Sequence, residues 1–167
     1  MISNSVLKMT RMFPLEEYDW KFGKRSLGCL EGVDEGLVET TKLALRYSPV
    51  DFGITCGVRT LEEQKKLLES GATQTLKSRH LEGMAVDIVV YVDGEVSWNI
   101  QHYTTAAQAF AEASREVGEP IRWGAAWTHL LNVTDAKQAN YEYVALRRKQ
   151  GRVPFIDGPH FEIPIKE

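Results

Sequence analysis

The sequence has little of what marks secreted, membrane-spanning or nucleic-acid-binding proteins. Its two cysteines, Cys29 and Cys56, are too few for a disulfide scaffold, and their spacing matches no paired-cysteine zinc site. We therefore predict two buried thiols without a histidine partner. The longest apolar run is Ile88–Val92, far shorter than the roughly 20 residues that a membrane-spanning helix needs. The net charge of −3 gives no general attraction to nucleic acid or to an anionic membrane.

The N-terminal residues carry scattered basic side chains but no continuous apolar segment, so we predict no signal peptide and synthesis in a reducing cytoplasm. There is also no internal repeat, low-complexity tract or linker rich in Pro or Ser. With 43% hydrophobic and 26% charged residues, the composition is ordinary for a globular protein. These absences predict a single domain over residues 1–167, without a separate wall-binding or DNA-binding domain.

The sequence does contain segments with the hydrophobic periodicity of helices, which alternate with segments that have the periodicity of strands. Thr60 and Glu63 form a capping-box pattern, and Asp93-Gly94 is typical of a hairpin turn. Helices are predicted at about 34–47, 60–70, 104–117 and 134–149, with Thr134 as a cap, and strands at about 52–56, 85–92, 95–98, 121–123 and 160–163. Residues 71–79 are predicted as a loop. Helices combined with mainly antiparallel strands indicate a small α+β fold, a sheet flanked by helices.

Two motifs carry residues suited to metal chemistry. His80 and Asp87 lie on either side of a turn that contains Gly83, so their side chains can converge on one cation. Asp157 and His160 frame a Gly-Pro bend just before the last predicted strand, and His160 can supply a third ligand. Imidazole and carboxylate groups are suitable zinc ligands, and three protein ligands with one open position are typical of a catalytic zinc site.

With these motifs, the chain resembles the M15 peptidases, whose signature SxHxxGxAxD matches Ser78 to Asp87. It resembles more narrowly the phage L-alanyl-D-glutamate endopeptidases, which cut the peptide stems of peptidoglycan. Further segments match in order: Phe22 to Ser26, Pro49 to Thr55, Gly57 to Thr60 with Gln64, Ile121 to Gly124, and Gly158 to Glu162. The resemblance implies the fold of M15 and D-Ala-D-Ala peptidases, also called Hedgehog-type.

The resemblance also implies roles for individual residues. His80, Asp87 and His160 would bind one Zn²⁺ ion, and Asp157 stands in the place of the family's catalytic carboxylate. Arg59 stands in the place of an arginine that either stabilises the oxyanion or pairs with a substrate carboxylate such as that of D-Glu, and the sequence leaves both roles open.

Two further residues receive less specific roles. Ser78 is a candidate for supporting a ligand or contacting substrate. Glu162 shares a strand face with His160, so it either orients that ligand or faces solvent.

The chain departs from the family pattern after Gly124. Short phage enzymes carry a second glycine and usually an Asp-Trp there, close to the final motif, whereas here Ala125-Ala126-Trp127 follows and a long stretch intervenes before Asp157. We predict a loop–helix insertion at about 125–155, over or beside the cleft. It contains the basic residues Arg147, Arg148, Lys149 and Arg152.

The predicted function is zinc-dependent hydrolysis of the L-Ala–D-Glu bond of peptidoglycan stem peptides during phage-induced lysis. The enzyme is expected to be a monomer in the host cytoplasm, without stable membrane association or nucleic-acid partner, and to need a holin-type protein for access to the wall. A D-Ala-D-Ala carboxypeptidase or dipeptidase is the alternative with the same chemistry. A non-enzymatic zinc-stabilised wall-binding module is the alternative from another class.

Overall fold

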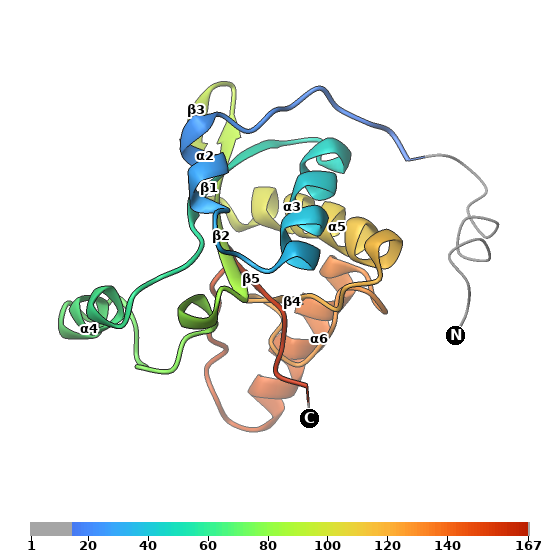
Figure 1. Ribbon diagram of the computed structural model, residues 1–167. Helices are drawn as coiled ribbons and strands as arrows, with labels where there is room; N and C mark the ends of the chain where they lie inside the picture. The colour runs from blue at the N-terminus through green and yellow to red at the C-terminus, as the bar shows by residue number, and fades with distance from the viewer. Residues whose placement is uncertain (1–14, 167) are drawn as a thin grey trace.

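The computed structural model of the protein describes residues 15–166. Helices and antiparallel strands alternate along the chain, and the elements are short apart from the helices α3, α5 and α6 (Figure 1). In chain order they are α2 (Lys24–Cys29), α3 (Glu35–Tyr47), β1 (Asp51–Cys56), α4 (Leu61–Glu69), the 3-10 helix η1 (Arg79–Glu82), β2 (Ala85–Val92), β3 (Glu95–Ser97), α5 (Ile100–Val117), β4 (Arg122–Trp123), α6 (Ala136–Lys149) and β5 (His160–Glu162).

The strands form one antiparallel sheet in the order β1-β2-β5-β4, with β3 paired to the outer part of β2. This is the α+β architecture that the hydrophobic pattern predicts. The strand at 85–92 has its predicted bounds, and α3 ends at the predicted residue 47 and begins one residue after the predicted start, because Asp34 caps it. The predictions are less accurate where a polar residue starts a helix: Asn99 caps α5 and Asp135, not Thr134, caps α6.

Two short elements were not predicted from the sequence. The helix α2 has no side-chain cap and no buried residue, so it carries no apolar stripe by which a sequence pattern could reveal it. The 3-10 helix η1 begins at the last residue of the predicted loop 71–79 and brings His80 into the site.

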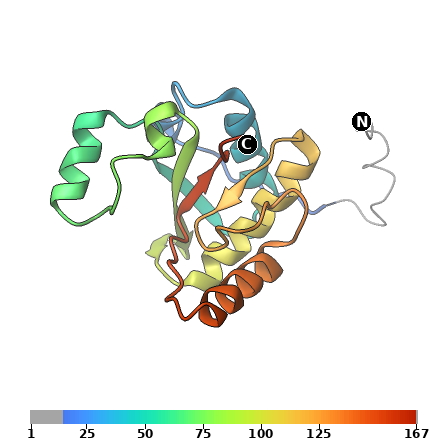
Figure 2. The ribbon, with the colours of Figure 1, turned by 90° about the horizontal axis from the view of Figure 1, so that it is seen from below.

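The hydrophobic core lies between one face of the sheet and the helices α3 and α5, with α5 across the sheet (Figure 2). Phe110 of α5 stacks on Phe161 of β5 at a ring-centroid distance of 3.9 Å and on Phe52 of β1 at 5.6 Å. Alanines on the buried face of α5 allow α3 to pack closely against it. Burial of each large apolar side chain of this kind contributes about 1.5–3 kcal/mol.

Strand β2 shows why the site lies on the other face of the sheet. Val86, Ile88 and Val90 are at most 1% exposed and point into the core. Because side chains alternate along a strand, Asp87 points to the opposite face. Phe161 likewise separates His160 from Glu162 on β5, so the residues of the last motif also face away from the core.

Two helices lie outside this core. Helix α4 projects from the body in both ribbon views, whereas α6 lies along α5 (Figures 1 and 2). Within residues 15–166, no helix combines the length and the apolarity that crossing a membrane requires.

Candidate functional site

The register of the sheet places three polar side chains in a row across neighbouring strands. Asp87 on β2 is opposite His160 on β5 on one side and opposite Cys56 on β1 on the other. An irregularity in the pairing between Ile54 and Cys56 brings Cys56, rather than Thr55, to this position. Local backbone pairing therefore brings together residues that are far apart in the sequence.

His80 reaches the same place from the turn before β2. Ser78 caps η1, and its Oγ accepts a hydrogen bond from the His80 backbone N–H at 3.3 Å. Gly83 ends this short helix in the left-handed conformation, with φ +70°, and a Cβ there would lie 2.7 Å from the carbonyl oxygen of Gly32. A residue other than glycine would be strained and would collide, so this glycine fixes the turn that buries His80 at 2% exposure.

The two imidazoles converge on one carboxylate oxygen. His80 Nε2 lies 3.1 Å from Asp87 Oδ1, and His160 Nδ1 lies 3.0 Å from the same oxygen. The two ring centroids are 5.1 Å apart. The structure thus brings the three residues that the sequence analysis names as metal ligands into one cluster.

The remaining nitrogen of each imidazole is fixed by a hydrogen bond. His80 Nδ1 lies 2.7 Å from the carbonyl oxygen of Gly57, and His160 Nε2 lies 2.8 Å from Glu162 Oε2. Since both partners only accept, each of these nitrogens donates a proton, and when the ring is neutral its other nitrogen, which faces Asp87, has a lone pair that can bind a cation. His80 Nε2 has no partner of acceptable hydrogen-bond geometry although it is buried. Two lone pairs and a carboxylate oxygen facing one another suit a divalent cation.

Glu162 is 4% exposed, so it does not face solvent. Besides His160, its carboxylate binds Arg122, whose Nε donates to Oε1 at 2.9 Å and whose Nη2 also contacts it. Burial raises the pKa of Glu162, but the bonds from His160 and Arg122 outweigh burial and lower it. Glu162 is therefore an ionised acceptor that orients the His160 ring. Arg122 lies in the matched segment from Ile121 to Gly124, but no role was predicted for it from the sequence.

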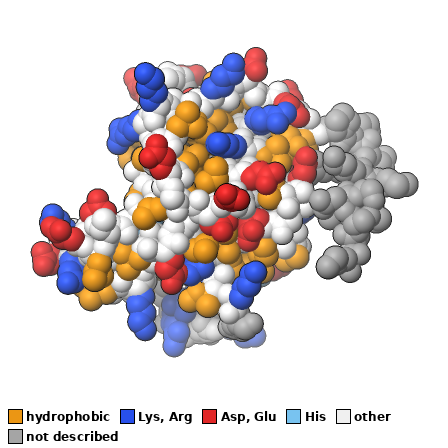
Figure 3. All heavy atoms as spheres, viewed as in Figure 1, with side chains coloured by type: hydrophobic (Ala, Val, Ile, Leu, Met, Phe, Trp, Pro, Cys, Tyr) orange, Lys and Arg blue, Asp and Glu red, His pale blue; other side chains and the backbone are white. Residues whose placement is uncertain are grey.

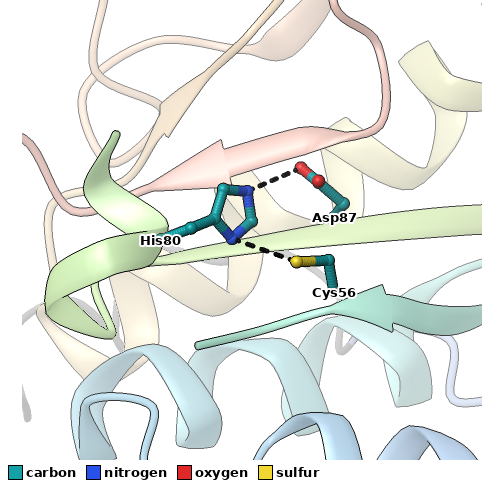
Figure 4. A group of neighbouring side chains, drawn as sticks. All are labelled: Cys56, His80 and Asp87. Atoms are coloured by element: carbon teal, nitrogen blue, oxygen red, sulfur yellow. Dashed lines mark hydrogen bonds and ion pairs between the residues drawn. The ribbon is translucent and has the colours of Figure 1, made fainter. Parts of the chain in front are cut away.

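Cys56 corrects the prediction that neither cysteine has a histidine partner. Both cysteines are free and half-buried, and Cys56 Sγ lies 3.7 Å from His80 Nδ1. Among residues 15–166, one group of three offers metal-ligating atoms that are all within 4.8 Å of one another: Cys56, His80 and Asp87. Figure 4 shows the His80 ring between the other two, contacting Asp87 through one nitrogen and Cys56 through the other. This arrangement could hold a metal ion.

Arg59 lies at the margin of the cluster. Its Nη2 is 3.4 Å from Asp87 Oδ2 and 3.4 Å from Cys56 Sγ, and its Nη1 donates to Gln64 Oε1 at 2.7 Å. Gln64 is fully buried and its amide donates to the carbonyl oxygen of Thr75 at 2.7 Å. The guanidinium is thus held in place by helix α4 beside the carboxylate that both imidazoles face.

Asp157 lies in the loop before β5 and is half-buried. Its backbone is paired with Gly124, whose carbonyl oxygen accepts from the Asp157 N–H at 2.9 Å. A Cβ at Gly124 would lie 2.3 Å from the Asp157 carbonyl oxygen, so only glycine allows this approach. Burial and the nearby Asp87 raise the pKa of the Asp157 carboxyl, and the two imidazoles oppose this effect.

The charges of the cluster are strongly coupled. Burial lowers the pKa of His80, but its contacts with Asp87 and Cys56 outweigh burial and raise it to about 10. Burial likewise lowers the pKa of His160, whereas Asp87 and Glu162 raise it to about 9. Burial raises the pKa of Asp87, but both histidines hold it far below its usual range. Protons on the rings thus supply positive charge next to Asp87, where a bound cation would supply the same charge.

A cluster of two imidazoles and a carboxylate, with an arginine and a second carboxylate beside it, is typical of the active site of a hydrolytic enzyme. Comparison with known proteins agrees with this class. Residues 18–163 match the family described as phage L-alanyl-D-glutamate peptidase. The chain therefore belongs to the phage L-alanyl-D-glutamate peptidase family.

Individual relatives share this description. The L-alanyl-D-glutamate peptidase of Escherichia phage T5 is 34% identical over 112 residues, which are 65% of this chain and 82% of that protein. That of Listeria phage A118 is 32% identical over 75 residues, 45% of this chain and 26% of that protein. The crystal structure of the Serratia marcescens L-Ala D-Glu endopeptidase ChiX aligns with a TM-score of 0.66 and 34% identity, covering 90% of this chain and 96% of that chain.

Proposed function

We propose that this protein hydrolyses the L-Ala–D-Glu bond in the stem peptides of peptidoglycan, with one zinc ion bound by His80, Asp87 and His160. The observation that carries the proposal is the convergence of His80 Nε2 and His160 Nδ1 on Asp87 Oδ1. It occurs in a chain whose family and relatives are named for this peptidase activity.

Two nitrogen ligands and one oxygen ligand suit zinc, and three protein ligands leave a position for catalysis. When bound, zinc lowers the pKa of a water molecule to about 7 and polarises a carbonyl group. We propose His160 rather than Cys56 as the third ligand. The contact of Cys56 with His80 is made at Nδ1, which already donates to the Gly57 carbonyl oxygen, whereas His160 and His80 face the same oxygen of Asp87.

Asp157 is proposed as the general base and acid. Its carboxyl is close enough to Asp87, His80 and His160 to interact with their charges, and Gly124 fixes its backbone. It would take a proton from the attacking water and pass it to the amine of D-Glu as the peptide bond breaks.

Arg59 is proposed to stabilise the oxyanion that forms on the scissile carbonyl. Its guanidinium stays charged over the whole working pH range, so it can donate hydrogen bonds but cannot act as a base. The bond from Nη1 to Gln64 fixes the guanidinium and leaves Nη2 directed at the ligand cluster. This position favours a role at the reacting carbonyl over one at a distant substrate carboxylate.

The proposed activity also implies where the protein acts. A phage enzyme of this kind would be made in the host cytoplasm as a monomer and would reach the wall after a holin-type protein opens the membrane. Ser78 would act through the backbone of His80, and residues 125–155 would form an insertion beside the substrate cleft.

Replacing Arg59 by methionine separates the two roles of this residue. We expect kcat to fall by roughly 10²–10³-fold, as for loss of an oxyanion donor, while KM changes little. Steady-state kinetics on a soluble stem peptide measure both constants, and Arg59→Lys is the control that keeps the charge. An increase in KM with unchanged kcat would show instead that Arg59 binds a substrate carboxylate.

Removal of the metal provides a second test. We expect EDTA to abolish cleavage of purified sacculi and added zinc to restore it, because three neutral or anionic ligands alone generate no nucleophile. The new amino termini should be those of D-Glu, identified by labelling and hydrolysis of the digest. Full activity in the chelator would contradict the proposed metal, and release of D-Ala would indicate a carboxypeptidase. A protein that holds zinc yet leaves sacculi uncut would be a binding module.

A further inference from the structure

A cavity lies next to the metal-ligand cluster, within the segment at 125–155. It has a volume of about 540 Å³ and lies between α6 and the chain that leads to β5. Its walls combine aromatic and apolar side chains with two arginines: Trp127, Tyr143, Leu146, Phe155, Arg147 and Arg152. None of the roles proposed above uses this cavity.

Trp127 is the wall that the cavity shares with the metal-ligand cluster. Its ring stacks on His160 at a centroid distance of 5.4 Å, and on Phe155 at 6.0 Å. Because an extended peptide spans about 3.3–3.6 Å per residue, roughly three residues of substrate cover the path from His160 through Trp127 to Phe155. A stem peptide bound at the cluster is long enough to enter the cavity.

The cavity is held open by bonds within the chain. Tyr143 of α6 donates its hydroxyl proton to the Phe155 carbonyl oxygen at 3.1 Å and accepts from the Phe155 N–H at 3.1 Å. Asn140 of the same helix donates to the Ala125 carbonyl oxygen at 2.6 Å. The Phe155 wall of the cavity is therefore tied to α6, and a ligand would not have to order this wall on binding.

Two polar atoms of the residues that line the cavity have no hydrogen-bond partner in the described part of the chain. Trp127 Nε1 and Arg147 Nε are buried without a hydrogen bond. Between residues 15 and 166, neither Arg147 nor Arg152 forms an ion pair with an acidic side chain. A buried donor without a hydrogen-bond partner lowers the stability of the fold. An anionic group that accepts hydrogen bonds from these donors would remove this cost.

The positive charge is local to this end of α6. The whole chain carries a net charge of −3, and on the face shown in Figure 3 acidic and basic side chains are interspersed. Basic residues in the last turn of a helix also interact favourably with the helix dipole, which explains Arg148 and Lys149 without a ligand. Arg147 and Arg152 differ from these two because they line an apolar cavity.

We propose that this cavity is a substrate subsite that binds a carboxylate of the stem peptide about three residues from the scissile bond. The apolar walls would contact the peptide's aliphatic atoms, and Arg147 and Arg152 would bind the carboxylate. The inference rests on the proposed function, since it assigns the cavity to the same substrate.

The test compares stem peptides in which each carboxylate beyond the scissile bond is free or amidated in turn. We expect one amidation to lower kcat/KM about tenfold for the unaltered protein, the loss of one hydrogen-bonded charge. Arg147→Gln and Arg152→Gln should lower kcat/KM for the free acid about tenfold and abolish the difference between the two peptides. Arg148→Gln and Lys149→Gln are matched controls on the same helix end and should behave like the unaltered protein.

A binding measurement keeps this test separate from that of the proposed function. Calorimetric titration with the product peptide, which needs no turnover, should give a Kd about tenfold weaker for Arg147→Gln than for Arg148→Gln. The subsite is contradicted if all four variants lose equal affinity, or if amidation has no effect on the unaltered protein. It is also contradicted if the arginines bind poly(glycerol phosphate) but not the peptide. Peptide that binds as expected but is not cleaved would contradict the proposed function alone.

Discussion

Replacement of His160 by alanine is expected to abolish both zinc binding and turnover. The ring of His160 supplies one of the two nitrogens that face Asp87 Oδ1, and no other imidazole is in contact with that oxygen in the described part of the chain except His80. With two ligands left, the site falls below the three that a catalytic zinc site requires. Zinc content after dialysis, measured by mass spectrometry, and hydrolysis of sacculi give the two readouts.

Two further variants test which residues besides His160 contribute to zinc binding. Glu162→Gln leaves the ligand in place but removes the charge that orients it, so zinc affinity should fall about 10–100-fold. Cys56→Ser should retain zinc, because the thiol contacts the protonated nitrogen of His80 and not the one facing Asp87. If Cys56→Ser loses the metal while His160→Ala keeps it, the ligand set is Cys56, His80 and Asp87, and the proposed site is wrong.

Replacement of Asp157 by asparagine is expected to lower kcat by about 10²–10⁴-fold, the usual contribution of general acid–base catalysis. Zinc content should not change, because Asp157 is not one of the three proposed ligands and its hydrogen bond with the His160 N–H is made by its backbone carbonyl oxygen, which the substitution keeps. Asparagine keeps the size of the side chain, so the pairing with Gly124 and the fold should persist. Steady-state kinetics together with metal analysis measure the effect.

Asp157→Glu is the matched control, since it keeps the carboxylate but displaces it, and it should retain more activity than the asparagine variant. Loss of zinc from Asp157→Asn would show that this residue is a ligand. Turnover within a few-fold of the unaltered protein would show that another group moves the proton.

Much of the site could be predicted from the sequence because short-range patterns position it. Alternation along Ala85–Val92 places Asp87 opposite the core residues Val86 and Ile88, and Gly83 marks the turn that carries His80. The same alternation places His160 and Glu162 on one face of β5, on either side of the buried Phe161. Periodicity of this kind is a local property of the chain, so a single sequence reveals it.

Other features depend on long-range pairing, which no local pattern encodes. Cys56 reaches Asp87 through an irregularity in the pairing of β1 and β2, and a regular register would have placed it elsewhere. Arg122 meets Glu162 only because β4 pairs with β5. Trp127 stacks on His160 through the path of the loop after Gly124. These contacts arise from tertiary structure and were found only there.

The ligand set can be tested most directly by anomalous diffraction at the zinc absorption edge from crystals grown with zinc. The account predicts one strong peak in contact with His80 Nε2, Asp87 and His160 Nδ1, with nitrogen distances of about 2.0–2.1 Å. Cys56 Sγ should lie outside the coordination sphere. A peak bound by Cys56, or a crystal with zinc bound elsewhere and none at this cluster, would contradict the account.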